Sequence, residues 1–280
     1  MPVVLDAPAK INLSLRVLRR REDGFHEITT RMAPLALADR VTLELLPDAS
    51  PGTVAFTCDD PTVPGDGTNL AVRAVRALEK HTGPLPGLRI HLEKRIPHGA
   101  GLGGGSSDAA AVLRGAGMLF QIAPGVLQDA AAETGSDVPF FLYERACDCA
   151  GRGEAVTPVD DFTWQPRVLL LKPPFGVATP DAYGRWRDSR EVPGFLYMEQ
   201  HTPGGMLVND LERPVFEKYP VLGLLKSRLF TCPGVQGALM SGSGSTVFAV
   251  LAPEADATAV TAAAAGIIGP GLWSCDTTVR

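Results

Sequence analysis

The sequence contains no long apolar run. No stretch of about 18 uninterrupted apolar residues occurs, which is the length that a membrane-spanning helix requires. The N-terminus also lacks the charged and then apolar pattern of a secretory signal segment. We therefore expect a cytoplasmic protein without a membrane partner.

Cysteine is scarce and scattered. The chain of 280 residues has 5 cysteines, an odd number, at positions 58, 147, 149, 232 and 275. Only Cys147 and Cys149 lie close together, and a single C-x-C pair is poor spacing for a zinc site. We therefore expect buried, reduced thiols and no metal held by cysteine.

An excess of positive charge is also missing. The 26 lysines and arginines and 31 acidic residues give a formal net charge of -5. The one basic run, residues 19–21, is followed directly by Glu22 and Asp23. Because nucleic-acid binders carry a basic stripe, we expect no nucleic-acid partner. The length and the 45% hydrophobic content suit one large or two modest globular domains.

Glycine, in contrast, is concentrated in one segment. Five glycines, at positions 99, 101, 103, 104 and 105, precede two serines, Asp108 and an alanine-rich run. Residues 88–96 alternate apolar and polar side chains, which predicts a strand that Pro97 ends. The pattern therefore predicts a strand, a glycine loop and a helix over about 106–120. Glycine lets successive N–H groups converge on an anion, and Ser106 or Ser107 can cap the helix, whose first turn favours phosphate.

Three nucleotide-binding signatures share this plan. A P-loop needs a lysine after its last glycine, whereas Gly105 and Ser106 follow Gly104, so this signature fails. Gly99, Gly101 and Gly104 satisfy the G-x-G-x-x-G of a dinucleotide site, but no acidic residue follows about 20 positions later. That motif is weak alone. A loop without a ligand is a further alternative, although five glycines would then cost chain entropy without a gain.

The third signature belongs to the GHMP small-molecule kinases. Their phosphate loop closely resembles the run Pro97-His98-Gly99-Ala100-Gly101-Leu102-Gly103-Gly104-Gly105-Ser106-Ser107. The resemblance implies that this loop binds ATP and that Mg²⁺ accompanies the nucleotide. It also implies that Asn69, which opens an amphipathic helix over 69–78, lies by the nucleotide. Capping of that helix is the equal alternative for Asn69.

Two further segments extend the resemblance. Residues 7–13 (APAKINL) resemble the opening motif of the branch of the family that acts on a cytidine diphosphate, and they imply that Lys10 and Asn12 face the active site. From the strand pattern alone, Lys10 would be a solvated lysine. The segment 238–248, with a Gly/Ser turn at 241–245, resembles the third motif of the family, which lies near the phosphates.

The segment 135–139 (GSDVP) resembles the catalytic element of the family. The resemblance implies that Asp137 is the general base and that Lys10 orients it and counters charge on the transferred group. An aspartate in this pattern is otherwise commonly a helix cap.

The resemblance also implies a cytidine pocket. The turn over 21–27 contains Phe25 and His26 where the branch has D-G-Y-H, so Phe25 replaces the usual tyrosine. An aromatic face stacks on a base, and a neutral imidazole offers one donor and one acceptor. Tyr183, three residues after a Thr-Pro pair, would close over the base, so that Phe25 and Tyr183 sandwich it. Without the resemblance, the histidine and both aromatics would be structural residues.

The remaining elements follow from periodicity and turn residues. We expect strands over 3–5 and 11–17 with an interruption at Pro8, a strand over 41–45 paired with 54–56, and a helix that Pro124 opens and that ends near Gly135. Later segments predict a hairpin turn over 151–154, strands over 168–171, 236–240 and 246–251, helices from 179, over 209–229 and through 262–265, and a last strand near Trp273. Residues 185–205 give no prediction.

The fold that the resemblance implies is α+β in two lobes. Residues 1–160 would form an N-terminal lobe that resembles ribosomal protein S5 domain 2, and residues 161–280 a ferredoxin-like lobe. The implied activity is transfer of the γ-phosphoryl group of ATP to the 2-hydroxyl of a diphosphocytidyl methylerythritol, in the non-mevalonate route to isoprenoid precursors. A GHMP kinase for mevalonate, homoserine or a sugar, and a non-catalytic nucleotide-binding protein of this fold, are the alternatives. The sequence predicts no oligomeric state.

Overall fold

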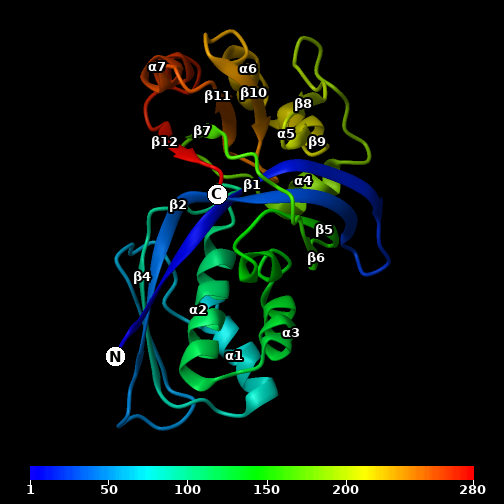
Figure 1. Ribbon diagram of the computed structural model, residues 1–280. Helices are drawn as coiled ribbons and strands as arrows, with labels where there is room; N and C mark the ends of the chain where they lie inside the picture. Colours follow the sequence, from blue (N-terminus) through cyan, green and yellow to red (C-terminus); the bar gives the residue numbers. More distant parts are fainter.

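The computed structural model describes residues 1–280, and the chain forms two sheets with helices packed beside each. The first sheet has the strand order β3-β4-β2-β1-β9-β8, with β5 paired to β2 and β6 to β5. Its strands are β1 (Val3–Arg20), β2 (His26–Leu45), β3 (Val54–Cys58), β4 (Leu88–Glu93), β5 (Cys147–Gly151), β6 (Ala155–Pro158), β8 (Gln200–Thr202) and β9 (Gly205–Asn209). The helices beside it in Figure 1 are α1 (Leu70–Thr82), α2 (Gly104–Phe120) and α3 (Pro124–Thr134), and the 3₁₀ turn η1 (Pro139–Leu142) follows them.

The second sheet has the order β10-β11-β7-β12. Its strands are β7 (Arg167–Lys172), β10 (Val235–Met240), β11 (Val247–Leu251) and β12 (Trp273–Thr278), and its helices are α4 (Thr179–Arg185), α5 (Glu212–Lys218), α6 (Pro220–Leu229) and α7 (Ala257–Ile268). Numbered along the chain, the strands lie in the order 4-1-3-2 and all pairs are antiparallel, which is the ferredoxin-like arrangement. The predicted α+β, two-lobed architecture is confirmed.

The long strand β1 carries the first site residues. It pairs antiparallel with β2 from Val3 opposite Leu43 to Arg20 opposite His26. The predicted interruption at Pro8 is wrong, because the strand continues through it. The pairing register shifts between Pro8 and the next paired residue, Lys10. Such an irregularity accommodates a residue that has no N–H to donate.

The predicted partner of the strand over 54–56 is also wrong. β3 pairs with β4 and runs parallel to it. β4, and not β3, pairs with β2, with Leu43 opposite Ile90. Parallel neighbours need a crossover of a dozen or more residues, usually a helix. The helix α1 lies between β3 and β4 in the chain and supplies it.

One hairpin joins the two halves of the chain. β8 and β9 come from the second half, yet β9 pairs parallel with β1 at Ser14 opposite Val208 and Leu15 opposite Asn209. Most of the unassigned segment 185–205 lies outside helix and strand, but it contains β8, and β9 begins at its last residue. A boundary at residue 160 stays a prediction, because the chain beyond it contributes strands to both sheets.

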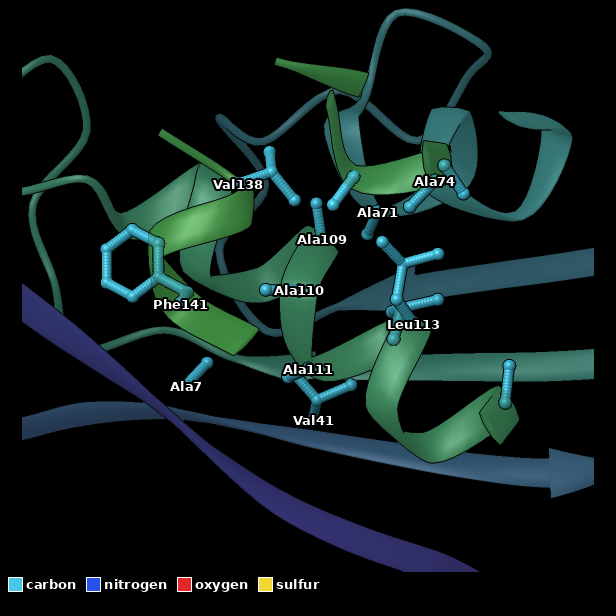
Figure 2. Packing of buried hydrophobic residues seen from close by; sticks show 14 of the residues in the cluster. Ala7, Val41, Ala71, Ala74, Ala109, Ala110, Ala111, Leu113, Val138 and Phe141 are labelled. Atoms are coloured by element: carbon cyan, nitrogen blue, oxygen red, sulfur yellow. The ribbon is translucent and has the colours of Figure 1, made fainter. Parts of the chain in front are cut away.

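Small side chains bring α2 close to its neighbours. Ala109, Ala110 and Ala111 are buried in one apolar cluster with residues of the sheet, α1 and η1. Figure 2 shows these alanines among Ala71, Ala74, Ala7, Val41, Val138 and Phe141. Close packing of this kind fixes the start of α2, where the glycine loop enters the helix.

The 5 cysteines are free thiols, as expected. Cys147, Cys149 and Cys232 are buried, whereas Cys58 and Cys275 are half-buried, so the expectation of burial is wrong for these two. Burial raises the pKa of Cys147 to about 12, so that thiol stays protonated at neutral pH. None of the helices combines the length and the apolar character that crossing a membrane would require.

Candidate active site

A cleft of about 1450 Å³ is lined by residues of both lobes. Nearly all site residues predicted from the sequence lie along it. They are Lys10, Asn12, Phe25, His26, Asn69, residues 97–106, Asp137 and Tyr183. Ser107 is the exception, because it is buried below the loop and its Oγ has no hydrogen-bond partner.

The glycine loop has a conformation that only glycine adopts without strain. Gly99, Gly101 and Gly103 have φ values of +63°, +75° and +72°. A Cβ at Gly101 would also lie 2.8 Å from the carbonyl oxygen of Gly244, and one at Gly103 would meet the ring of Phe141 at 2.7 Å. The loop and the first turn of α2 therefore bring backbone N–H groups to the cleft, which suits a phosphate.

The predicted serine cap of this helix is wrong. Gly103, in the left-handed conformation, is the N-cap residue of α2, and no side chain bonds the first-turn N–H groups. Ser106 and Ser107 lie inside the first turn, where they cannot act as the cap. The missing cap leaves first-turn donors free for an anion.

Lys10 and Asp137 face each other across the cleft. Lys10 Nζ lies 3.8 Å from Asp137 Oδ2, and it donates to Asn12 Oδ1 at 2.6 Å and to the carbonyl oxygen of Gly101 at 3.1 Å. Burial lowers the pKa of Lys10, and the charge of Asp137 opposes this shift. Lys10 is 4% exposed, so the strand pattern alone was misleading. Asn12 in turn donates to Thr30 Oγ1 at 2.8 Å.

Asn69 caps α1 and also lines the cleft. Its Oδ1 accepts from the N–H of Ala71 at 2.8 Å, and its Nδ2 donates to the carbonyl oxygen of Pro64 at 2.8 Å. The capping prediction is confirmed, and the nucleotide contact stays a prediction.

The turn between β1 and β2 presents Phe25 and His26. The His26 ring stacks on Tyr183 with 5.2 Å between centroids, and the Arg152 guanidinium lies 4.9 Å from the centroid of the Phe25 ring. Burial, with the positive charge of Arg20, lowers the pKa of His26, so the imidazole is neutral at pH 7. The predicted sandwich of a base between Phe25 and Tyr183 stays a prediction.

The sequence reasoning missed two neighbours of these rings. Trp186 packs its edge toward His26, with 6.2 Å between centroids, and Arg152 covers Phe25. Both residues line the cleft. The sequence predicts Arg152 only as part of a hairpin turn, and the structure confirms this turn between β5 and β6.

A buried charge cluster beneath the glycine loop was also missed. Lys94 Nζ pairs with Asp39 Oδ2 and, at 2.6 Å, with Asp108 Oδ2. Asp39 Oδ1 also accepts the N–H of Ile96 at 2.8 Å, which holds the start of the loop. Burial raises the pKa of Asp108 to about 7, and its Oδ1 has no partner. The available signal was an acidic residue, Asp108, directly before a run of buried alanines in α2.

The topology excludes the dinucleotide alternative. A dinucleotide site sits on a mostly parallel, doubly wound sheet. Here only β3 with β4 and β1 with β9 are parallel pairs, and the second sheet is wholly antiparallel.

Family models match both lobes. The model described as the GHMP kinases N terminal domain matches residues 69–145, and the one described as GHMP kinases C terminal matches residues 198–266. A protein of Methylacidiphilum infernorum named 4-diphosphocytidyl-2-C-methyl-D-erythritol kinase is 42% identical over 95% of this chain and 93% of its own length. One of the same name from Gloeobacter violaceus is 40% identical over 98% of this chain and 94% of its own.

Solved structures agree with these relatives. A crystal structure of 4-(cytidine 5'-diphospho)-2C-methyl-D-erythritol kinase is 35% identical, covers 99% of this chain and 100% of its own, and superposes with a TM-score of 0.76. A homoserine kinase from Cytophaga hutchinsonii, 19% identical, covers 100% of this chain and 94% of its own with a TM-score of 0.68, and shares the fold.

Proposed function

Because this chain belongs to the 4-diphosphocytidyl-2-C-methyl-D-erythritol kinases of the GHMP family, we propose that it phosphorylates the 2-hydroxyl of 4-diphosphocytidyl-2-C-methyl-D-erythritol with ATP. The product is the 2-phosphate, a precursor in the non-mevalonate route to isoprenoids. One observation carries the proposal: a single cleft holds the glycine loop, the Lys10–Asp137 pair and the stacked His26 and Tyr183 rings. The structural relative that acts on homoserine, at 19% identity, shares the fold alone.

Phosphoryl transfer asks mainly for positioning and charge stabilisation. In the proposed reaction, the loop over 97–107 holds the ATP phosphates. Asp137 accepts the proton of the 2-hydroxyl as that oxygen bonds to the γ-phosphorus, and the bond from the γ-phosphorus to the bridging oxygen breaks to leave ADP. Lys10 orients Asp137, 3.8 Å away, and counters negative charge on the transferred group.

The cytidine end is assigned to the aromatic side of the cleft. The neutral imidazole of His26 offers one donor and one acceptor to the edge of cytosine. Phe25 and Tyr183 supply faces for stacking, and Asn12 lies beside Lys10, where the methylerythritol end must approach. Compared with the tyrosine that is usual at this position, Phe25 keeps the stacking surface and lacks only a hydroxyl contact.

Magnesium belongs to the proposal as the ion that accompanies ATP. No group of three or more acidic, histidine or cysteine side chains gathers in the structure to hold a metal. Mg²⁺ is often held chiefly by phosphates and water, and the proposal assigns it no protein ligand. Bound there, it would neutralise phosphate charge. We also propose that the enzyme acts in the cytoplasm on this small molecule, without a nucleic-acid partner.

Substrate choice tests the function. The purified protein with Mg²⁺ and ATP would be offered the cytidine diphosphate methylerythritol and, separately, mevalonate, homoserine and galactose. We expect ADP formation with the first compound only. Turnover of any other compound would still identify the protein as a kinase, but it would refute the assignment of a cytidine pocket.

Asp137→Ala tests the assignment of the base. Removal of a general base costs roughly 10²–10⁴ in rate, so we expect kcat to fall by that factor with the fold intact. Asp160→Ala is the matched control, because that carboxylate is 91% exposed and pairs only with Arg145. An Asp137→Ala enzyme with near-normal turnover would refute the role.

A further inference from the structure

The turn over 241–245 forms one wall of the cleft and contacts the glycine loop. Ser241 Oγ donates to the carbonyl oxygen of Gly101 at 3.0 Å. Just after the turn, the N–H of Thr246 donates to the carbonyl oxygen of Ala100 at 3.2 Å. Gly242 lines the cleft, and a Cβ there would lie 3.3 Å from Lys10 Nζ. The turn and Lys10 therefore bond the same carbonyl oxygen of the loop, that of Gly101, and a displacement of the turn would disturb both the loop and the lysine.

Asn209, at the end of β9, holds this turn from behind. Its buried Nδ2 donates to two carbonyl oxygens, those of Met240 and Gly242, each at 2.7 Å, and its Oδ1 accepts from the N–H of Leu211 at 2.9 Å. An amide has two N–H groups, and both are used here. No other side chain of similar size can make the same set of bonds.

Glu212 completes the support. Its Oε1 accepts the N–H of Met240 at 3.0 Å, and its Oε2 pairs with Lys226 Nζ at 2.6 Å, with both side chains almost fully buried. Asn209 and Glu212 thus hold both backbone groups of Met240, the last residue of β10. Because Asn209 also pairs with Leu15 of β1, the segment 209–212 connects the strand that carries Lys10 to the turn that faces it.

We propose that Asn209 is a positioning residue for the ATP site: it fixes Gly242 against the glycine loop and beside Lys10. This inference rests on the proposed kinase function. It assigns chiefly the phosphate end of the cleft to the control of Asn209. A residue that merely stabilised the lobe would instead change the amount of folded enzyme.

Asn209→Asp separates these roles. The substitution keeps the size and places a carboxylate oxygen against two carbonyl oxygens, so the turn must move. We expect KM for ATP and the Kd of a non-hydrolysable ATP analogue to rise about tenfold or more, the scale of one lost buried hydrogen bond. KM for the cytidine substrate should change much less, because the turn reaches the cytidine end only through the bond between Ser243 Oγ and Thr179 Oγ1. Leu225→Ala is the matched control, because it opens a cavity in the core of the same lobe and removes none of the hydrogen bonds from Asn209 to the turn. It should lower the melting temperature and change neither KM.

The outcomes are distinct. A wild-type protein that binds the ATP analogue but does not turn over the cytidine substrate would refute the proposed function, and analogue binding by the variant would still decide the inference. An Asn209→Asp protein with wild-type analogue affinity would overturn the inference. If that variant does not fold, Gly242→Ala decides. Its Cβ would lie 3.3 Å from Lys10 Nζ and from Asn12 Oδ1, and its φ of +57° is strained for alanine, so it displaces the turn that Asn209 holds. Unchanged ATP binding there would overturn the inference as well.

Discussion

At the scale of single residues, the cluster of Lys94, Asp39 and Asp108 imposes an electrostatic cost on the fold. One ammonium between two buried carboxylates leaves one negative charge uncompensated. An unpaired buried charge is expensive, so the native protein favours protonation of one carboxylate. Asp108 is that residue, because burial raises its pKa to about 7 and its Oδ1 has no hydrogen-bond donor.

Asp108 should therefore make the stability depend on pH. The native state holds a proton that the unfolded state, with a pKa of 3.8, releases. The contribution is fully present below pH about 4 and is lost as pH rises to about 7, with a slope of at most about 1.4 kcal/mol per pH unit. Asp108→Asn should remove this slope. Urea unfolding at pH 5 and pH 7.5 measures it, with Asp160→Asn as the exposed control. Equal slopes in wild type and Asp108→Asn would contradict the prediction.

Lys10 and Asp108 show how far a local sequence pattern predicts the environment of a single residue. Strand alternation makes Lys10 a solvated lysine, yet β1 is buried on both faces at that point, where the glycine loop covers it. Only the resemblance of residues 7–13 to a family motif placed Lys10 in the cleft. Asp108 and Asp39 lie 69 positions apart in sequence, and their meeting depends on the tertiary fold, so no local pattern could predict the cluster.

At the scale of elements, variants of Asn69 test whether this residue both caps α1 and contacts the nucleotide. Asn69→Ala removes the acceptor for the N–H of Ala71 and should cost about 1 kcal/mol of stability. Asn69→Ser keeps an acceptor for that N–H and removes the amide that donates to Pro64, so its stability should stay near wild type. If the amide also contacts the nucleotide, KM for ATP rises in both variants. Thermal unfolding and ATP titration of both proteins measure this. An unchanged KM in both would leave Asn69 as a cap alone.

Element boundaries followed local signals where those signals were strong. Pro124 at the first position of α3 and Gly135 after its end match the structure, as do β7, β10 and β11. The helix expected over 209–229 is wrong in its bounds, because Asn209 ends β9 and the helical part is divided into α5 and α6. Two other errors concern strand pairing. The neighbour of β3 depends on a crossover through α1, and the register shift at Pro8 depends on β2. Gly103 caps α2 because the loop needs a left-handed residue there, which outweighs the preference for serine.

At the scale of the whole molecule, the two lobes share structure. One apolar cluster contains Ile11 and Leu13 of β1 together with Leu170, Leu239 and Phe248 of the second sheet. The hairpin β8–β9 adds strands from the second half of the chain to the first sheet. The sequence predicted the two-lobed class through a family resemblance, but this shared core consists of residues far apart in the chain and was not predicted.

The shared core predicts that the protein unfolds as one cooperative unit. Phe248 is fully buried in it, between Leu170 and Leu239 of the neighbouring strands. Phe248→Ala should cost about 3–5 kcal/mol and lower one transition without splitting it. Scanning calorimetry measures this as a calorimetric enthalpy equal to the van't Hoff enthalpy. A fragment of residues 1–160 would lack β8–β9 and expose the edge of β1, so it should not unfold cooperatively. Two resolved transitions would instead show that the lobes are independent domains and would support a boundary near residue 160.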